Sequence, residues 1–197
     1  MLALRLPRLR LAPPRLARFA RDDRGNMTVE AAILMPILLM TFVGLYSVFD
    51  GFRQQSVDQR AAYTLSDMLS RETDLIDDTY IDNAYKMLRF LANTQDSNVR
   101  MRISVVSYNE FQDRYTIEWS EVRGGTYKSY LTKDVKDWHD ILPIMADGDQ
   151  LILVETQVDY IPPVGFGLGK RTISTRVFNR PRFTSQLRWD DGTGAGA

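Results

Sequence analysis

Gly25 and Glu30 are the two residues whose types and spacing could support chemistry, in this case at a peptide bond. Hydrolysis after Gly25 would leave Asn26 as a new N-terminus, with Glu30 as the fifth residue. In a helix, positions i and i+4 share one face, so the new ammonium group and the Glu30 carboxylate could pair. The pairing could be within one chain or between neighbouring chains, where a low dielectric strengthens the attraction. The helix dipole and snorkelling to the headgroups would also accommodate a carboxylate in the first turn without any such role.

Side chains that carry most enzymatic chemistry are scarce in the rest of the chain. There is no cysteine, which excludes disulfides and thiol catalysis, and the single histidine is His139. Asp137 and Asp140 lie beside it, but the nucleophile or further ligands that a catalytic or metal site needs are missing. Glycines 165, 167 and 169 resemble a phosphate-binding loop, yet no helix is expected to follow them. The sequence therefore predicts no catalytic residue, no metal, no cofactor and no enzyme.

Four aspartates gather in residues 74–82, DLIDDTYID. Several carboxylates could bind Ca²⁺, but their spacing does not match an EF-hand loop. Asp77 or Asp78 would serve equally well as the N-cap of the helix that follows, because acids are favoured at that end. We expect this capping role, and a helix that ends near Asn93.

An uncharged run of nineteen residues extends from Ala31 to Phe49. A helix of that length is about 28 Å long, close to the hydrocarbon thickness of a bilayer. The run exceeds the apolar core of a secretory signal, and no A-x-A-like cleavage site follows it. We therefore expect a transmembrane helix over residues 26–52, bent at Pro36. Gly44 and Ser47 place small side chains one turn apart, which could seat another helix or reflect ordinary membrane-helix composition.

Residues 1–25 read as a basic leader. They hold seven arginines and two aspartates, a net charge of +5, whereas residues 26–197 hold eighteen basic and twenty-three acidic residues, a net charge of −5. The arginines before the span predict a cytoplasmic N-terminus and a head on the other side. An organellar transit peptide is the alternative for such a leader, although a span follows it directly. An acidic exported part without a basic patch argues against nucleic acid as a partner.

The order of basic leader, glycine, four residues, glutamate and uncut hydrophobic helix resembles that of type IV prepilins. More narrowly, residues 24–39, RGNMTVEAAILMPILL, are similar to the N-terminal signature of TadE-like proteins of the tight-adherence (Flp pilus) system. That signature is R-G-x-x-x-V-E-[FA]-A, then an apolar run with an early proline; the matching residues are Arg24, Gly25, Val29, Glu30, Ala32 and Pro36. Ala31 and Asn26 differ from Flp-type processing sites, which often have tyrosine and phenylalanine at these two positions. The resemblance implies a minor pilin or pseudopilin. Some such proteins are processed by a dedicated prepilin peptidase, which in this chain would cut after Gly25.

Residues 53–189 are predicted to form an extracytoplasmic α+β head of pilin-like outline. The span should continue as an amphipathic helix whose apolar stripe is Val57, Ala61, Leu65, Met68 and Leu69. Its other faces are predicted to carry Arg53, Gln54, Asp58, Gln59 and Asp67. A second helix, over residues 79–93, should bury Ile81, Ala84, Tyr85, Leu88 and Leu91. A short helix over residues 133–145 should bury Val135, Trp138, Ile141 and Leu142.

Alternating residues predict an antiparallel sheet of about four strands. The first strand should bury Val99, Met101, Ile103 and Val105 and turn Arg100, Arg102 and Ser104 away. The second should place Tyr115, Ile117 and Trp119 on one face, and the last should do so with Ile173, Thr175 and Val177. Phe166 and Leu168, at the tip of the last hairpin, are candidates for partner or lipid contact. Residues 190–197 are predicted to be a disordered tail.

Three classes of function follow. The first is a structural subunit of a tight-adherence pilus or related secretion machine, in the bacterial inner membrane with a periplasmic head, which could enter a surface pilus. Its partners would be the membrane, other pilin-like subunits and the assembly machinery, and Glu30 would offset a neighbour's N-terminal charge and set the register. The second is an uncleaved single-pass envelope scaffold or sensor, for which Gly25 and Glu30 are incidental. The third, an exported enzyme, would have to rely on carboxylates alone.

Overall fold

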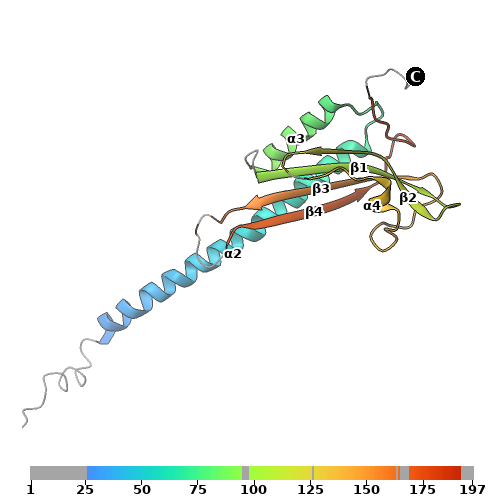
Figure 1. The fold of residues 1–197 in the computed structure, drawn as a ribbon. Coiled ribbons are helices and arrows are strands. Elements are labelled where there is room, and N and C mark those ends of the chain that lie inside the picture. The colour runs from blue at the N-terminus through green and yellow to red at the C-terminus, as the bar shows by residue number, and fades with distance from the viewer. Residues whose placement is uncertain (1–25, 95–97, 126, 163, 165–168, 192–197) are drawn as a thin grey trace, which may run out of the picture. The chain divides into compact units, whose positions relative to one another are not determined.

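The fold is that of a computed structural model, which describes residues 26–94, 98–125, 127–162, 164 and 169–191. The leader with Gly25, the loop residues Phe166 and Leu168, and residues 192–197 lie outside this part. The chain divides into two compact units, residues 1–46 and residues 47–197. The described part of the first unit is helical, and the second unit is an α+β head, so the predicted fold class is confirmed at this level (Figure 1).

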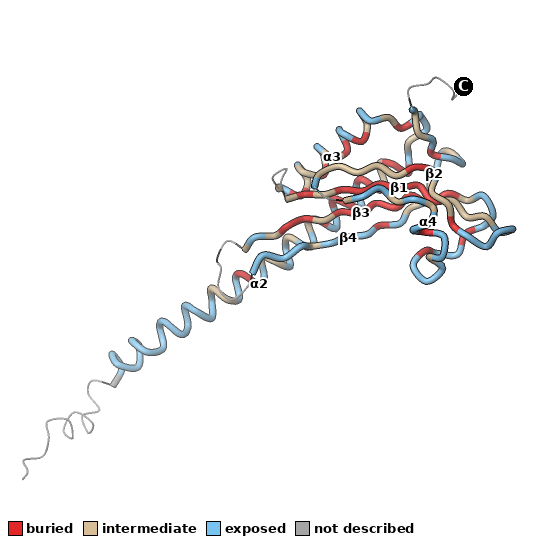
Figure 2. Tube along the Cα trace, viewed as in Figure 1, coloured by how far each residue is buried: buried red, intermediate tan, exposed pale blue. Residues whose placement is uncertain are grey.

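Within the described residues, helix α2 (Asn26–Ser70) continues through Pro36 without ending there. In its first part every large apolar side chain from Ile33 to Met40 is at least 50% exposed, as the blue tube in Figure 2 shows. By length and composition, α2 is a helix that could cross a membrane. In length and composition, α2 therefore agrees with the predicted transmembrane helix.

The second part of α2, residues 47–70, packs with α3 (Asp78–Ala92) on one face of the sheet. The predicted stripe is confirmed by Ala61, Leu65 and Leu69, which are buried in the main core. The prediction for Asp58 is wrong, because its side chain is only 1% exposed. Its helix face turns toward the head, so a position that looks polar by periodicity alone is covered.

Helix α3 has the predicted caps. The Asp77 carboxylate accepts a hydrogen bond of 2.7 Å from the Tyr80 amide, which satisfies one of the unpaired donors at the helix start. Asn93 ends the helix in the left-handed conformation, with φ of 50°. Asp78 and Asp82 form ion pairs with Arg123, so two of the clustered aspartates tie α3 to the sheet.

The sheet has the four predicted strands, all antiparallel, in the order β2-β1-β3-β4. They are β1 (Val99–Asn109), β2 (Arg114–Arg123), β3 (Gln150–Tyr160) and β4 (Arg171–Asn179). Inner strands β1 and β3 are buried on both faces over most of their length (Figure 2). The half-buried pattern predicted for β1 is therefore wrong: Arg102 is 8% exposed and Ser104 is fully buried.

The second face of the sheet is covered by residues 127–145, which include the short helix α4 (Thr132–Val135). Val135 and Leu142 enter a second core cluster as predicted, but Ile141 is 41% exposed. A longer helix does not form, because the chain makes successive tight turns: the Trp138 amide bonds to the Val135 carbonyl and the Ile141 amide to the Trp138 carbonyl. Residues 127–145 thus cover the face of the sheet that carries Arg102 and Ser104, which the alternating pattern of β1 assigns to solvent.

A bulge in the β1–β2 pair changes which residues of β2 share a face. Val105 pairs with Trp119 and Val106 pairs with Ile117, so the register shifts by one residue between them. Trp119 consequently packs in the main core, whereas Tyr115 and Ile117 contact the second cluster. The prediction that the three share one face is wrong for this reason. In β4, by contrast, Ile173, Thr175 and Val177 are the less exposed residues, as predicted.

After β4 the chain returns over the main core. The Trp119 indole donates a 2.8 Å hydrogen bond to the Leu187 carbonyl, and Trp189 forms a parallel bridge with Ile76. The Asp190 amide donates to the Ile76 carbonyl, so defined structure extends into the segment predicted as tail.

Candidate functional site

Glu30 is exposed on α2, as an assembly contact requires. The helix begins at Asn26, so these two residues have the predicted i, i+4 spacing. Glu30 is therefore in the second turn, and the first turn of α2 contains no acidic residue. The described part of α2 thus presents an exposed Glu30 one helical turn after Asn26.

Gly44 and Ser47, the two small residues of the predicted helix contact, differ in their surroundings. A Cβ added at Gly44 would meet no heavy atom within 4 Å, so this side of α2 is open. Ser47 is fully buried, and its hydroxyl donates a 3.3 Å hydrogen bond to the Val164 carbonyl. The small side chain of Ser47 therefore accommodates a segment of its own head.

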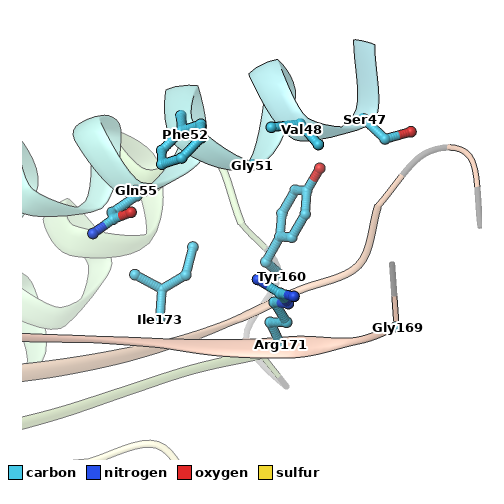
Figure 3. Close-up of a pocket in the computed structure, with 9 residues that line it drawn as sticks. All are labelled: Ser47, Val48, Gly51, Phe52, Gln55, Tyr160, Gly169, Arg171 and Ile173. Atoms are coloured by element: carbon cyan, nitrogen blue, oxygen red, sulfur yellow. The ribbon is translucent and has the colours of Figure 1, made fainter. Parts of the chain in front are cut away.

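A hollow of about 320 Å³ lies beside Ser47, between α2 and the ends of β3 and β4. Figure 3 shows residues 47–55 of the helix above it and Tyr160 and Ile173 reaching up from the strands. Its apolar lining includes Val48, Phe52 and Ile173, and Arg171 adds a cation. It offers an apolar recess with a basic group at its side.

A hydrogen bond between Tyr160 and Asp50 fixes the geometry of this hollow. The Tyr160 hydroxyl donates a 2.7 Å hydrogen bond to Asp50 Oδ2, which ties the end of β3 to α2. Gly51 faces the ring, and a Cβ there would lie 3.7 Å from Tyr160 Cε1. The recess is thus set by contacts within the head. Sequence reasoning missed it, because Tyr160 lies 110 positions after Asp50.

A second polar group holds the same end of the sheet. Asp159 is 7% exposed and accepts hydrogen bonds from Arg100, at 3.3 and 2.9 Å, and from Thr172, at 2.7 Å. Lys170 lies 3.4 Å from the same carboxylate. The hydrogen bonds from Arg100 are the main cause of a lowered pKa of Asp159, which is about 2. This carboxylate is therefore a fixed negative charge that orders the start of β4.

On the second face of the sheet, Glu155 joins two arginines. Arg102 Nε donates to it at 2.7 Å and Arg176 Nε at 2.8 Å. The Arg102 guanidinium lies 3.5 Å from the centre of the Tyr130 ring, and it also donates to the Lys128 carbonyl at 2.9 Å. These contacts hold residues 127–130 over the sheet, so the cluster has a structural role.

Asp58 is the other buried carboxylate that the sequence did not reveal. Gln54 donates to Asp58 Oδ1 at 2.9 Å and to the Ala92 carbonyl at 3.0 Å, while Asp58 Oδ2 is buried without a hydrogen-bond partner. Burial raises the pKa of Asp58 to about 6, although the hydrogen bond from Gln54 lowers it in part. In sequence, Gln54 and Asp58 look like an ordinary exposed i, i+4 pair.

His139 is exposed, as predicted, with 44% of its side chain accessible. Its ring centre lies 5.2 Å from that of Tyr115, and Nδ1 is 4.0 Å from Asp113 Oδ1. Among the described residues, no group of three or more histidines and acids is arranged to hold a metal ion. The arrangement around His139 is therefore a surface aromatic contact.

Comparison with known proteins adds no relative. No protein family, characterised protein or solved structure matches the chain. The functional argument consequently depends on α2 and on the head that follows it.

Proposed function

We propose that this protein is a membrane-anchored structural subunit of the TadE-like kind, a minor pilin or pseudopilin of a tight-adherence pilus or related secretion machine. One observation carries the proposal: the exposed apolar part of α2 has a single carboxylate, Glu30, four residues after the helix start at Asn26. A long N-terminal helix followed by an antiparallel sheet adds support, since it is pilin-like in outline.

In this role, the exposed apolar side chains of α2 would exchange contact with lipid for contact with other helices. In a bilayer, the exposed side chains of α2 contact lipid and its backbone groups are satisfied within the helix. In a filament, the same side chains would contact helices of other subunits. Glu30 would be costly in either interior unless it is paired, and a neighbour's N-terminal ammonium at Asn26 is the partner of opposite charge. The pairing would therefore fix the register between subunits.

The proposed location is the bacterial inner membrane, crossed once. The leader arginines would keep the N-terminus in the cytoplasm, and the head would lie in the periplasm. A prepilin peptidase would cut after Gly25, and other pilin-like subunits and their assembly machinery would be the partners. The alternative function, an uncleaved scaffold or sensor of the envelope, needs only the helix and the head.

Two measurements test the proposal. Intact-mass analysis of the membrane-extracted protein should show a chain that starts at Asn26; a full-length chain in the functional protein would favour the scaffold. Glu30→Ala should insert into the membrane normally and be missing from isolated assemblies, whereas the nearby control Thr28→Ala should be incorporated. Normal incorporation of Glu30→Ala would exclude the register role.

A further inference from the structure

One end of the head, next to the uncharged run, combines exposed apolar and basic side chains. We call it the base surface, and its members are Phe49, Phe52, Arg53, Ile161, Lys170 and Arg171. We propose that the base surface contacts the phospholipid headgroups of the membrane that α2 crosses, with a preference for anionic lipids. The inference rests on α2 crossing a membrane, and it does not depend on cleavage, on Glu30 or on assembly.

The apolar members of the base surface are largely exposed and lie close to the end of the uncharged run. Phe49, Phe52 and Ile161 are 74%, 66% and 60% exposed. Phe49 is the last residue of the uncharged run, so Phe52 lies within about 5 Å of its end along a helix. Phenylalanine is typical of helix faces that are buried at the boundary between headgroups and acyl chains. Ile161 belongs to the same surface, because Tyr160 beside it is bonded to Asp50 of α2.

The basic members give the surface its charge preference. Arg53 and Lys170 have 81% and 59% of their side chains exposed, and Arg171 is also exposed. The facing acids are Asp50 and Asp159, and Asp159 is also neutralised by Arg100. Cations therefore outnumber acids here, although residues 26–197 as a whole have a net charge of −5. Long basic side chains next to an apolar span extend to phosphate groups.

The hollow beside these cations supports lipid as the occupant. It is lined by Val48, Phe52 and Ile173, with Arg171 at its side (Figure 3). A headgroup phosphate on Arg171 would leave the adjoining glycerol and first acyl carbons against the apolar lining. A phospholipid fits this combination because its phosphate and its hydrocarbon lie within a few ångströms of each other. A second copy of the chain is the competing occupant, and the experiment separates the two.

The absence of cysteine from the sequence allows a direct test in the full chain. Single cysteines replace Phe52 or Ile161, and a matched control replaces Phe111, which is 98% exposed in the β1–β2 turn. β1 starts at the base, where Val99 pairs with Val158, so this turn lies about 35 Å away at the opposite end of the strand. Each variant carries a bimane label and is reconstituted in vesicles of phosphatidylcholine with phosphatidylglycerol.

Phosphatidylcholine carrying a nitroxide on its headgroup should quench the label at 52 and 161 several-fold more than the label at 111. Equal quenching at the three sites would overturn the proposal. The proposal would also be overturned if the label at 161 were shielded from the quencher and this shielding disappeared when the protein was diluted with excess lipid. That result would identify a second copy of the chain as the occupant.

The charge preference has its own variant pair. Lys170→Gln with Arg171→Gln should lower the preference for spin-labelled phosphatidylglycerol over phosphatidylcholine by about 25-fold, because each of the two cations near an anionic surface contributes about a fivefold factor. Lys133→Gln with Arg114→Gln, two exposed positions away from the base surface, should leave it unchanged. An unchanged preference in the first pair would refute the electrostatic contact. A protein that fails to assemble but keeps both responses would refute the proposed function alone.

Discussion

Replacement of Asp58 by asparagine should change how the stability of the head depends on pH. The Asp58 carboxylate lies on α2 beyond the uncharged run, is 1% exposed, and has one oxygen with no hydrogen-bond partner. Burial therefore disfavours its ionised form. Asparagine has nearly the same shape, can still accept the hydrogen bond from Gln54 and carries no charge at any pH.

The size and sign of the effect follow from the pKa of Asp58. It is about 6 in the folded head, against an ordinary value of 3.8. Each pH unit between the two is worth about 1.4 kcal/mol, so ionisation of the buried carboxylate costs the folded state about 3 kcal/mol. Because the folded pKa is raised, the stability is fully present below about pH 4 and is lost as pH rises through 6. Asparagine removes this loss.

The assay is thermal unfolding of the full chain in non-ionic detergent, followed by near-ultraviolet circular dichroism of the tryptophans, which all lie in the head. The difference in unfolding free energy between Asp58→Asn and the parent chain should be about 3 kcal/mol more favourable at pH 8 than at pH 4. For a unit of this size that corresponds to about 6–12 °C in melting temperature.

The matched control is Asp67→Asn on the same helix, where the carboxylate is 42% exposed and pairs with Arg71. It should give no gain in stability at pH 8. Parallel pH profiles for Asp58→Asn and the parent chain would refute the reasoning, because they would mean that the buried carboxylate is solvated or paired in the folded head.

Two further predictions concern the polar groups of the sheet. Glu155→Gln leaves Arg102 and Arg176 without their carboxylate, so the free energy of unfolding should fall by about 3–5 kcal/mol in urea titrations, and Arg102→Met in the same chain should recover part of the loss. Asp159→Asn should destabilise the head at pH 7. Since its lowered pKa of about 2 makes the charge stabilising above about pH 4, the melting temperatures of variant and parent should converge as pH falls toward 2.

Local patterns were sufficient to predict most elements of this fold. The stripe with Ala61, Leu65 and Leu69, and the caps at Asp77 and Asn93, depend on residues within a few positions of each other. The same is true of the uncharged run in α2. In each case the physical cause, a helix face or an unpaired backbone donor, is present in the segment itself, so neighbours in sequence are enough to reveal it.

The errors share a different cause. Arg102 looks exposed in an alternating strand, but its partner Glu155 is 53 positions later and its cover comes from residues 127–130. The bulge that separates Trp119 from Ile117 is a shift of a single residue, with no glycine to mark it. Asp58 is buried where α2 meets the head, and Gln54, which bonds to it, also bonds to the Ala92 carbonyl at the end of α3, 38 positions later. The residues that bury Arg102 and Asp58 are distant in sequence, and no residue type marks the bulge. Local patterns therefore indicate none of the three.

The same reasoning applies to the base of the head. Asp50 is the first charged residue after the uncharged run, and from sequence alone it marks the place where the helix meets water. In the fold, its carboxylate is held by Tyr160 at the end of β3, and buried Ser47 is already bonded to Val164. The head therefore packs against one side of α2 already at Ser47, before the uncharged run ends. Phe49 and Phe52 remain 74% and 66% exposed at this level of the helix, and the quenching experiment reports lipid contact at position 52.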